Sequence, residues 1–196
     1  MKIGVLAIQG DVREHQRHLT ALGCEVPLVR RVADLDGVEG LVMPGGESTA
    51  IGLLMQEEGL LDELRARIAR GFPVYGTCAG LILLARDIEG PPPPRVGAMD
   101  ITANRNAYGR QLASFEAALD IPAVGETPFV AVFIRAPRIA RMGPGVVPLA
   151  FLDKEPVMAE QGPLLVSAFH PELTGDNRVH RYFVEKVRTA HYRPAS

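Results

Sequence analysis

Short apolar runs alternate with segments of helical periodicity along the first 85 residues. The apolar runs predict buried strands at residues 3–8, 25–29, 40–43 and 73–75. Apolar residues at helical spacing predict helices at residues 11–22, 49–58, 60–70 and 81–85, with Ser48 as the N-cap of the second. Strands that alternate with helices in this way are typical of a parallel, doubly wound sheet.

The second half of the chain changes to strands that follow one another directly. They are predicted at residues 100–103, 115–119, 129–134, 146–151, 156–160 and 164–169, before a closing helix at 179–189. We therefore predict an α/β fold of three layers, in which a mostly parallel central sheet carries flanking helices and antiparallel additions. A single domain is expected to span residues 1–196. The four prolines at 91–94 predict a stiff exposed loop, and a domain linker is the alternative.

Composition and charge exclude several classes of protein. The chain is 47% hydrophobic and 22% charged, as globular proteins are, and its net charge of -2 gives no electrostatic reason to bind nucleic acid or an anionic membrane. Two cysteines do not make a disulfide framework, and the N-terminal apolar run of about seven residues is too short for a signal peptide. No stretch approaches the roughly 20 apolar residues of a membrane span. We expect a cytoplasmic protein without nucleic acid or membrane partners.

The first candidate for chemistry is Cys78, which lies in a G-x-C-x-G segment at residues 76–80. A short strand precedes this segment and an apolar helix follows it, which is the layout of a nucleophile elbow. Glycines permit so sharp a turn, and the helix N-terminus favours a thiolate. The alternative is that Cys78 is a small buried apolar residue, as most free cysteines are.

A base and an orienting acid for this thiol are predicted on one short loop. His170 and Glu172 follow the strand predicted at 164–169, with Pro171 stiffening the turn between them. Sites in open parallel sheets gather beyond the carboxyl ends of strands, so His170 is expected to face Cys78 although 92 residues separate them. Taken alone, this segment is also compatible with an ordinary turn.

Acyl transfer further needs N–H donors for a developing oxyanion. The segment P-G-G-E-S-T at residues 44–49 follows a predicted strand, and its glycines let the backbone approach a ligand closely. A phosphate-binding P-loop is rejected because the segment lacks the G-K-[ST] sequence. A plain strand-to-helix turn is the remaining alternative.

These three motifs, in this order, resemble those of class I glutamine amidotransferases, a family with a flavodoxin-like core. Further segments resemble the glutaminase subunits of pyridoxal 5'-phosphate synthase: Gln9-Gly10 with V-R-E-H at 12–15, Arg105-Asn106 with Y-G-R-Q at 108–111, S-F-E at 114–116 and F-I-R-A-P at 133–137. The resemblance runs from residue 2 to about residue 189. Asp11 and the proline run depart from the usual pattern; Asp11 is expected to affect partner geometry and not the chemistry.

The resemblance implies a function and a set of site residues. Cys78 would attack the side-chain amide of L-glutamine, with His170 as base and acid and Glu172 orienting His170. The implied oxyanion hole is formed by the backbone N–H groups of Gly46 and Ala79. The implied substrate-binding residues are Gly46, Glu47, Ser48, Arg105, Ile134 and Arg135. No cofactor and no metal are implied.

The resemblance also implies a partner. Ammonia would pass to a synthase subunit with a (β/α)8 barrel, which builds pyridoxal 5'-phosphate. The implied docking residues are Gln9, Gly10, Arg13, Glu14 and His15. On spacing alone, His15 and His18 are two histidines on one helix face, for which a solvated face is favoured over a metal site. Two other functions stay open at this point: a γ-glutamyl hydrolase that acts alone, and a non-catalytic docking module.

Overall fold

A mixed sheet of seven strands forms the centre of the computed structural model, which describes residues 1–105, 114–190 and 192. Its strand order is β10-β11-β12-β4-β3-β1-β2. The strands are β1 (Ile3–Leu6), β2 (Leu28–Val29), β3 (Gly40–Met43), β4 (Val74–Thr77), β10 (Val147–Leu152), β11 (Glu155–Gln161) and β12 (Leu164–Ser167). Neighbours from β12 to β2 pair in parallel, whereas β11 and β10 extend the sheet in antiparallel register.

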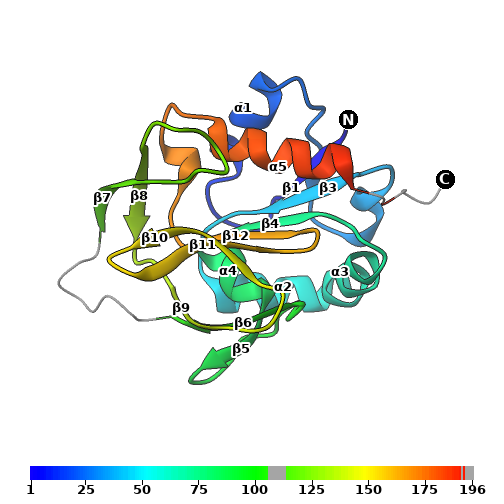
Figure 1. Cartoon of the computed structure of the whole chain (residues 1–196). Helices are drawn as coiled ribbons and strands as arrows, with labels where there is room; N and C mark the ends of the chain where they lie inside the picture. The colour runs from blue at the N-terminus through cyan, green and yellow to red at the C-terminus, as the bar shows by residue number, and fades with distance from the viewer. Residues whose placement is uncertain (106–113, 191, 193–196) are drawn as a thin grey trace.

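Helices cover both faces of this sheet and make the three layers that the sequence predicts (Figure 1). One face carries α1 (Val12–Ala21) and α5 (Arg178–Thr189), and the other carries α2 (Ser48–Glu57), α3 (Leu60–Ala69) and α4 (Ala79–Leu84). Two short 3-10 helices, η1 (Val32–Leu35) and η2 (Pro171–Leu173), lie in connections. The buried strands read as continuous apolar runs because helices exclude water from both of their faces.

The antiparallel additions are only partly additions to the central sheet. β10 and β11 extend it as expected, but the other strands pair apart from it. β5 (Ala85–Glu89), β6 (Met99–Asn104) and β9 (Arg138–Met142) form one small sheet, and β7 (Ser114–Leu119) and β8 (Phe129–Ile134) form a hairpin. The sequence predicted neither β5 nor β9, whose largely exposed, charged residues lack an apolar pattern.

Two local expectations need correction. Glu47, and not Ser48, is the N-cap of α2: its carboxylate accepts hydrogen bonds from the N–H groups of Thr49 and Ala50 at 2.9 and 2.7 Å. These two bonds also hold the pKa of Glu47 below its usual value. The proline run at 91–94 is a loop, but it is not fully exposed, since Pro93 is buried.

Close backbone contacts explain the glycines on either side of Cys78. A Cβ atom on Gly80 would lie 2.2 Å from the carbonyl oxygen of Met43, and one on Gly76 would lie 2.5 Å from the carbonyl group of Gly80. Neither position has room for a side chain unless the backbone moves. The glycines therefore allow β3, β4 and α4 to pack closely around the turn that carries the thiol.

We predict that Gly80→Ala lowers the free energy of unfolding by about 1–3 kcal/mol, because the added methyl group overlaps a backbone carbonyl. Gly175→Ala is the matched control, since its Cβ atom would meet nothing within 4 Å, and it should change stability by no more than about 0.5 kcal/mol. Urea unfolding followed by circular dichroism measures both variants. Equal stabilities of the two variants would contradict the packing argument.

Candidate active site

Cys78 occupies a strained turn between β4 and α4. Its backbone φ is 48° and its ψ is -101°, a conformation that costs a non-glycine residue about 1–3 kcal/mol. The turn is held from β12, because the Cys78 N–H donates to the carbonyl oxygen of Ser167 at 2.9 Å. The Sγ atom lies 3.9 Å from the carbonyl oxygen of Ile134 at the end of β8. This geometry is that of the nucleophile elbow predicted from the sequence.

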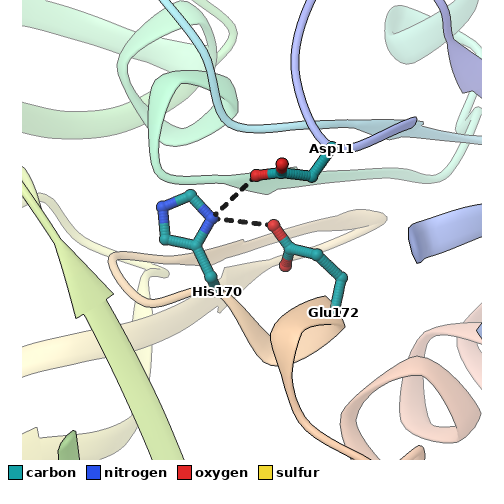
Figure 2. A group of neighbouring side chains, drawn as sticks. All are labelled: Asp11, His170 and Glu172. Carbon is teal, nitrogen blue, oxygen red and sulfur yellow. Dashed lines mark hydrogen bonds and ion pairs between the residues drawn. The ribbon is translucent and has the colours of Figure 1, made fainter. Parts of the chain in front are cut away.

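His170 reaches Cys78 from the carboxyl end of β12. The backbone N–H of His170 donates to the carbonyl oxygen of Val132 on β8 at 2.8 Å. Nδ1 of its ring lies 2.7 Å from Oε1 of Glu172 (Figure 2). Burial alone would lower the pKa of His170, but its hydrogen bonds and charge interactions with Cys78 and Glu172 outweigh burial and raise the pKa to about 10. The structure therefore brings the predicted residues together: Cys78 and His170 line one cavity, and Glu172 contacts His170.

Glu172 is a buried carboxylate with a histidine beside each oxygen. Nδ1 of His170 lies at Oε1, and Nε2 of His15 lies 3.4 Å from Oε2. Burial would raise the pKa of Glu172, but electrostatic interactions and hydrogen bonds with His15 and His170 hold it well below its usual value. Glu172 is therefore charged at neutral pH, and its charge favours the protonated form of His170.

A cavity of about 580 Å³ opens in front of the thiol, within the usual range for small-molecule sites. It includes every substrate-binding and oxyanion residue that the sequence predicted. The lining residues are Gln9, Gly10, Asp11, Gly46, Glu47, Ser48, Cys78, Ala79, Ile82, Arg105, Ile134, Arg135 and His170. Glu172 does not line the cavity and lies behind His170.

Two arginines supply positive charge to the cavity. Nη2 of Arg105 lies 3.0 Å from Oγ1 of Thr49 and 3.3 Å from Oε1 of Glu47, so Arg105 is held at the start of α2. Arg135 is exposed and has a positive φ of 43°. The Glu47 carboxylate caps α2 and pairs with Arg105, so the cavity wall carries two guanidinium groups together with the carboxylates of Asp11 and Glu47.

The predicted docking segment touches the cavity from the side of α1. The side-chain oxygen of Gln9 accepts a hydrogen bond from the N–H of Glu47 at 2.9 Å. Gly10 packs so tightly that a Cβ atom there would lie 1.7 Å from the carbonyl oxygen of Gly45. Arg13 is exposed and Glu14 is half-buried, as surface contacts require. The segments Asn106 and Tyr108 to Gln111, quoted in the resemblance, lie outside the described residues.

His15 does not fit the docking surface or the solvated helix face that its spacing predicted. Its side chain is fully buried, with Nδ1 at 2.9 Å from Nε2 of His180 and Nε2 at 3.3 Å from Oγ1 of Thr77. No local pattern pointed to His180, because α5 covers this face of α1 only in the folded chain (Figure 1). The assignment of His15 to docking is therefore wrong as a direct surface contact.

Asp11 is closer to the chemistry than expected. Its Oδ2 atom lies 3.5 Å from Nδ1 of His170, on the same nitrogen that contacts Glu172 (Figure 2). Burial and the Glu172 charge raise the pKa of Asp11. One side-chain atom each of Asp11, His170 and Glu172 lies within 4.8 Å of the others, a spacing that a metal ion could bridge. However, Nδ1 of His170 and Oε1 of Glu172 are only 2.7 Å apart, which is the distance of a direct hydrogen bond.

We predict that Asp11→Asn lowers the pKa of His170, because it removes a negative charge 3.5 Å from Nδ1 while keeping the size of the side chain. Titration of the His170 ring by NMR measures the change. Asp120→Asn, at an exposed acidic residue, is the control and should leave the His170 titration unchanged. An unchanged titration in Asp11→Asn would show that the second carboxylate does not act on the imidazole.

Comparisons with known proteins agree with this geometry. The model of the SNO glutamine amidotransferase family matches residues 5–189. A protein of Carboxydothermus hydrogenoformans is 56% identical over 187 residues, which cover 95% of this chain and 98% of that protein. One of Pelotomaculum thermopropionicum is 58% identical, with 95% of each chain covered. Both are named pyridoxal 5'-phosphate synthase subunit PdxT.

Solved structures extend the comparison to the fold. A crystal structure titled as a glutamine amidotransferase is 49% identical and superposes with a TM-score of 0.91 over 95% of this chain and 99% of its own. The structure of PurLQS from Thermotoga maritima, 15% identical, shares the fold alone, with a TM-score of 0.71 over 94% of this chain and 97% of its own. With a family model over nearly all of its length and close relatives over the same span, the chain belongs to the SNO glutamine amidotransferase family.

Proposed function

We propose that this chain hydrolyses L-glutamine to glutamate and ammonia, and that it delivers the ammonia to the synthase subunit of a pyridoxal 5'-phosphate synthase. The observation that carries the proposal is that Cys78 and His170 line one cavity with two arginines, and that Glu172 holds His170 from behind. Its relatives bear the name of a pyridoxal 5'-phosphate synthase subunit, which supports the same assignment.

In the first half of the reaction, the Cys78 sulfur attacks the side-chain carbonyl carbon of glutamine. His170, whose pKa of about 10 keeps it protonated at neutral pH, balances the charge of the thiolate. As the tetrahedral intermediate collapses, the C–N bond breaks, His170 donates its proton to the nitrogen, and ammonia leaves. A glutamyl thioester on Cys78 is the product of this half.

In the second half, water attacks the thioester. The neutral His170 now accepts a proton from the water, the C–S bond breaks, and glutamate leaves. Glu172 accepts the Nδ1–H of His170 at 2.7 Å throughout, so the ring keeps its other nitrogen toward the sulfur. No metal or cofactor is needed for either half.

The cavity has groups of the kind that glutamine requires. Arg105 and Arg135 are suited to the substrate carboxylate, because a guanidinium donates two parallel hydrogen bonds to a carboxylate. Gly46, Glu47, Ser48 and Ile134 complete the proposed substrate contacts. The backbone N–H groups of Gly46 and Ala79 are proposed to stabilise the oxyanion.

The proposed partner is the (β/α)8-barrel subunit, docked at Gln9, Gly10, Arg13 and Glu14. This segment lies beside the cavity and hydrogen-bonds to its wall through Gln9. Among the described parts of the chain, every helix is too short or too polar to cross a membrane. Both cysteines are free, and the proposed nucleophile needs a reducing compartment, for which we propose the cytoplasm.

We predict that Cys78→Ala lowers glutamine-dependent ammonia release by at least about a thousandfold, because it removes the nucleophile. The measurement uses the complex with the cognate synthase subunit, with complex formation checked by gel filtration. Appreciable turnover by the variant would contradict the proposed mechanism. Hydrolysis of γ-glutamyl peptides to glutamate and the released amino acid without the partner would instead support a hydrolase that acts alone.

We predict that Arg13→Glu raises the partner concentration needed for half-maximal glutaminase activity by roughly tenfold or more, because it reverses a charge at the proposed interface. Arg70→Glu is the matched control, since Arg70 is an exposed arginine that follows α3 on the opposite face of the sheet (Figure 1). Titration of ammonia release with the synthase subunit distinguishes the two. Equal effects of both variants would argue against docking at α1.

A further inference from the structure

Two buried histidines, a buried threonine and the half-buried His18 form a polar group on the far side of Glu172 from His170. His15 of α1 lies between Glu172 and His180 of α5, with Nε2 at 3.4 Å from Oε2 and Nδ1 at 2.9 Å from Nε2 of His180. The ring of His18 stacks on His180 with centroids 4.4 Å apart and planes inclined by 7°. His15 and His180 are both fully buried, and nothing in the proposed reaction uses them.

The position of each proton follows from which atoms have partners. Nδ1 of His180 is buried and has no hydrogen-bond partner, so a proton there would be an unpaired N–H. Burial holds the pKa of His180 well below its usual value, so the ring is neutral and carries its single proton on Nε2. That N–H points to Nδ1 of His15, which must therefore accept.

The same reasoning places the proton of His15. Because Nδ1 accepts, the proton of His15 is on Nε2, which faces Oε2 of Glu172 and Oγ1 of Thr77. Oε2 of Glu172 is buried and has no hydrogen bond at standard geometry, but Nε2 of His15 lies 3.4 Å from it, within ion-pair distance. A buried carboxylate oxygen without a donor is costly, and this N–H is placed to satisfy it.

We propose that His15 is a positioning residue of the catalytic site, which holds Glu172 through its Nε2–H while His180 fixes the orientation of His15. His180 then donates to His15 and His15 donates to one oxygen of Glu172, while His170 donates to the other oxygen, so donors from both sides converge on the carboxylate. The functional part of this proposal rests on the proposed glutaminase activity, whereas the proton positions do not. It also replaces the assignment of His15 to the docking surface.

The other groups around Glu172 have different partners, so the donor to Oε2 is assigned to His15. On the opposite oxygen, His170 is the proposed base and Asp11 is a second carboxylate. His18 bonds instead to the carbonyl oxygen of Thr174 at 3.1 Å. In the part of the chain that the structure describes, Tyr75, Glu14 and Arg17 are further titratable or charged groups near Glu172, besides His180. Tyr75 hydrogen-bonds to Ser167 at 2.9 Å, and Glu14 has no proton to donate when it is charged.

Ring ¹⁵N NMR of the full chain tests the proton positions without reference to the reaction. We expect His15 and His180 to be protonated on Nε2 alone near neutral pH, because only these tautomers give Oε2 and Nδ1 of His15 a donor. A spectrum with His15 protonated on Nδ1 alone would overturn the proposal. If the tautomers are as expected and the wild-type complex releases no ammonia, the proposed function fails instead.

Kinetics of the assembled complex test the positioning role. His15→Leu removes the donor and should lower kcat for glutamine about tenfold or more, with KM changed less than about twofold. Since His15 lowers the pKa of Glu172, the acid limb of the pH profile should move to higher pH. His15→Gln keeps a side-chain N–H near Nε2 and should restore most of kcat and return the acid limb toward that of the wild type.

A second buried substitution separates this role from a loss of stability. Arg67 lies in α3, across the sheet from α1 and His15 (Figure 1). Arg67→Met removes a buried side chain that hydrogen-bonds to Glu63 and to the carbonyl oxygen of Leu35. It should lower the melting temperature but leave kcat and the acid limb as in the wild type. Equal kcat losses in Arg67→Met and His15→Leu, or an acid limb unmoved in His15→Leu, would overturn the positioning role.

Discussion

The site depends on one buried negative charge, the carboxylate of Glu172. Its side chain is fully buried, and such a group stays ionised only when opposite charge and hydrogen bonds replace the lost water. Histidines stand at both of its oxygens, and together they hold its pKa well below the usual range. The charge in turn favours the protonated form of His170, so a residue behind the cavity acts on the imidazole together with Cys78, which lines the cavity.

The two faces of the sheet contribute differently to this arrangement. α4 and the start of α2 line the cavity, while α1 and α5 bring the histidines that lie behind Glu172. The loop before α1 joins the two sets, because Gln9 bonds to Glu47 and Asp11 contacts His170. The proposed docking segment is thus in direct contact with both the substrate wall and the base.

The sequence was most informative where one local pattern decides the structure. β3 has the predicted bounds because an apolar run ends at Pro44, and the turn at Cys78 was recognisable because its glycines follow from backbone sterics. Cys78, His170 and Glu172 were found in the same way, since each follows a predicted strand. The fold brings them together at one end of the sheet, whereas the roles of the catalytic, substrate and docking residues stay predictions.

The remaining features depend on long-range packing that no local pattern encodes. Helical spacing placed His15 on a face of α1, but only the packing of α5 shows that this face is buried. Asp11 was expected to affect only partner geometry because it lies beside the predicted docking segment, yet the chain path carries it to His170. β5 and β9 were missed because edge strands with charged side chains have no apolar alternation.

The strained turn at position 78 has an evolutionary consequence. A residue with a φ of 48° would be better tolerated as glycine, which has no Cβ atom to oppose that conformation. A cysteine at this position adds backbone strain but supplies the thiol. Selection for stability therefore favours glycine at position 78, whereas selection for turnover favours cysteine. In a descendant of this chain that no longer needs the thiol, replacement of Cys78 by glycine would remove this strain and raise the stability of the fold.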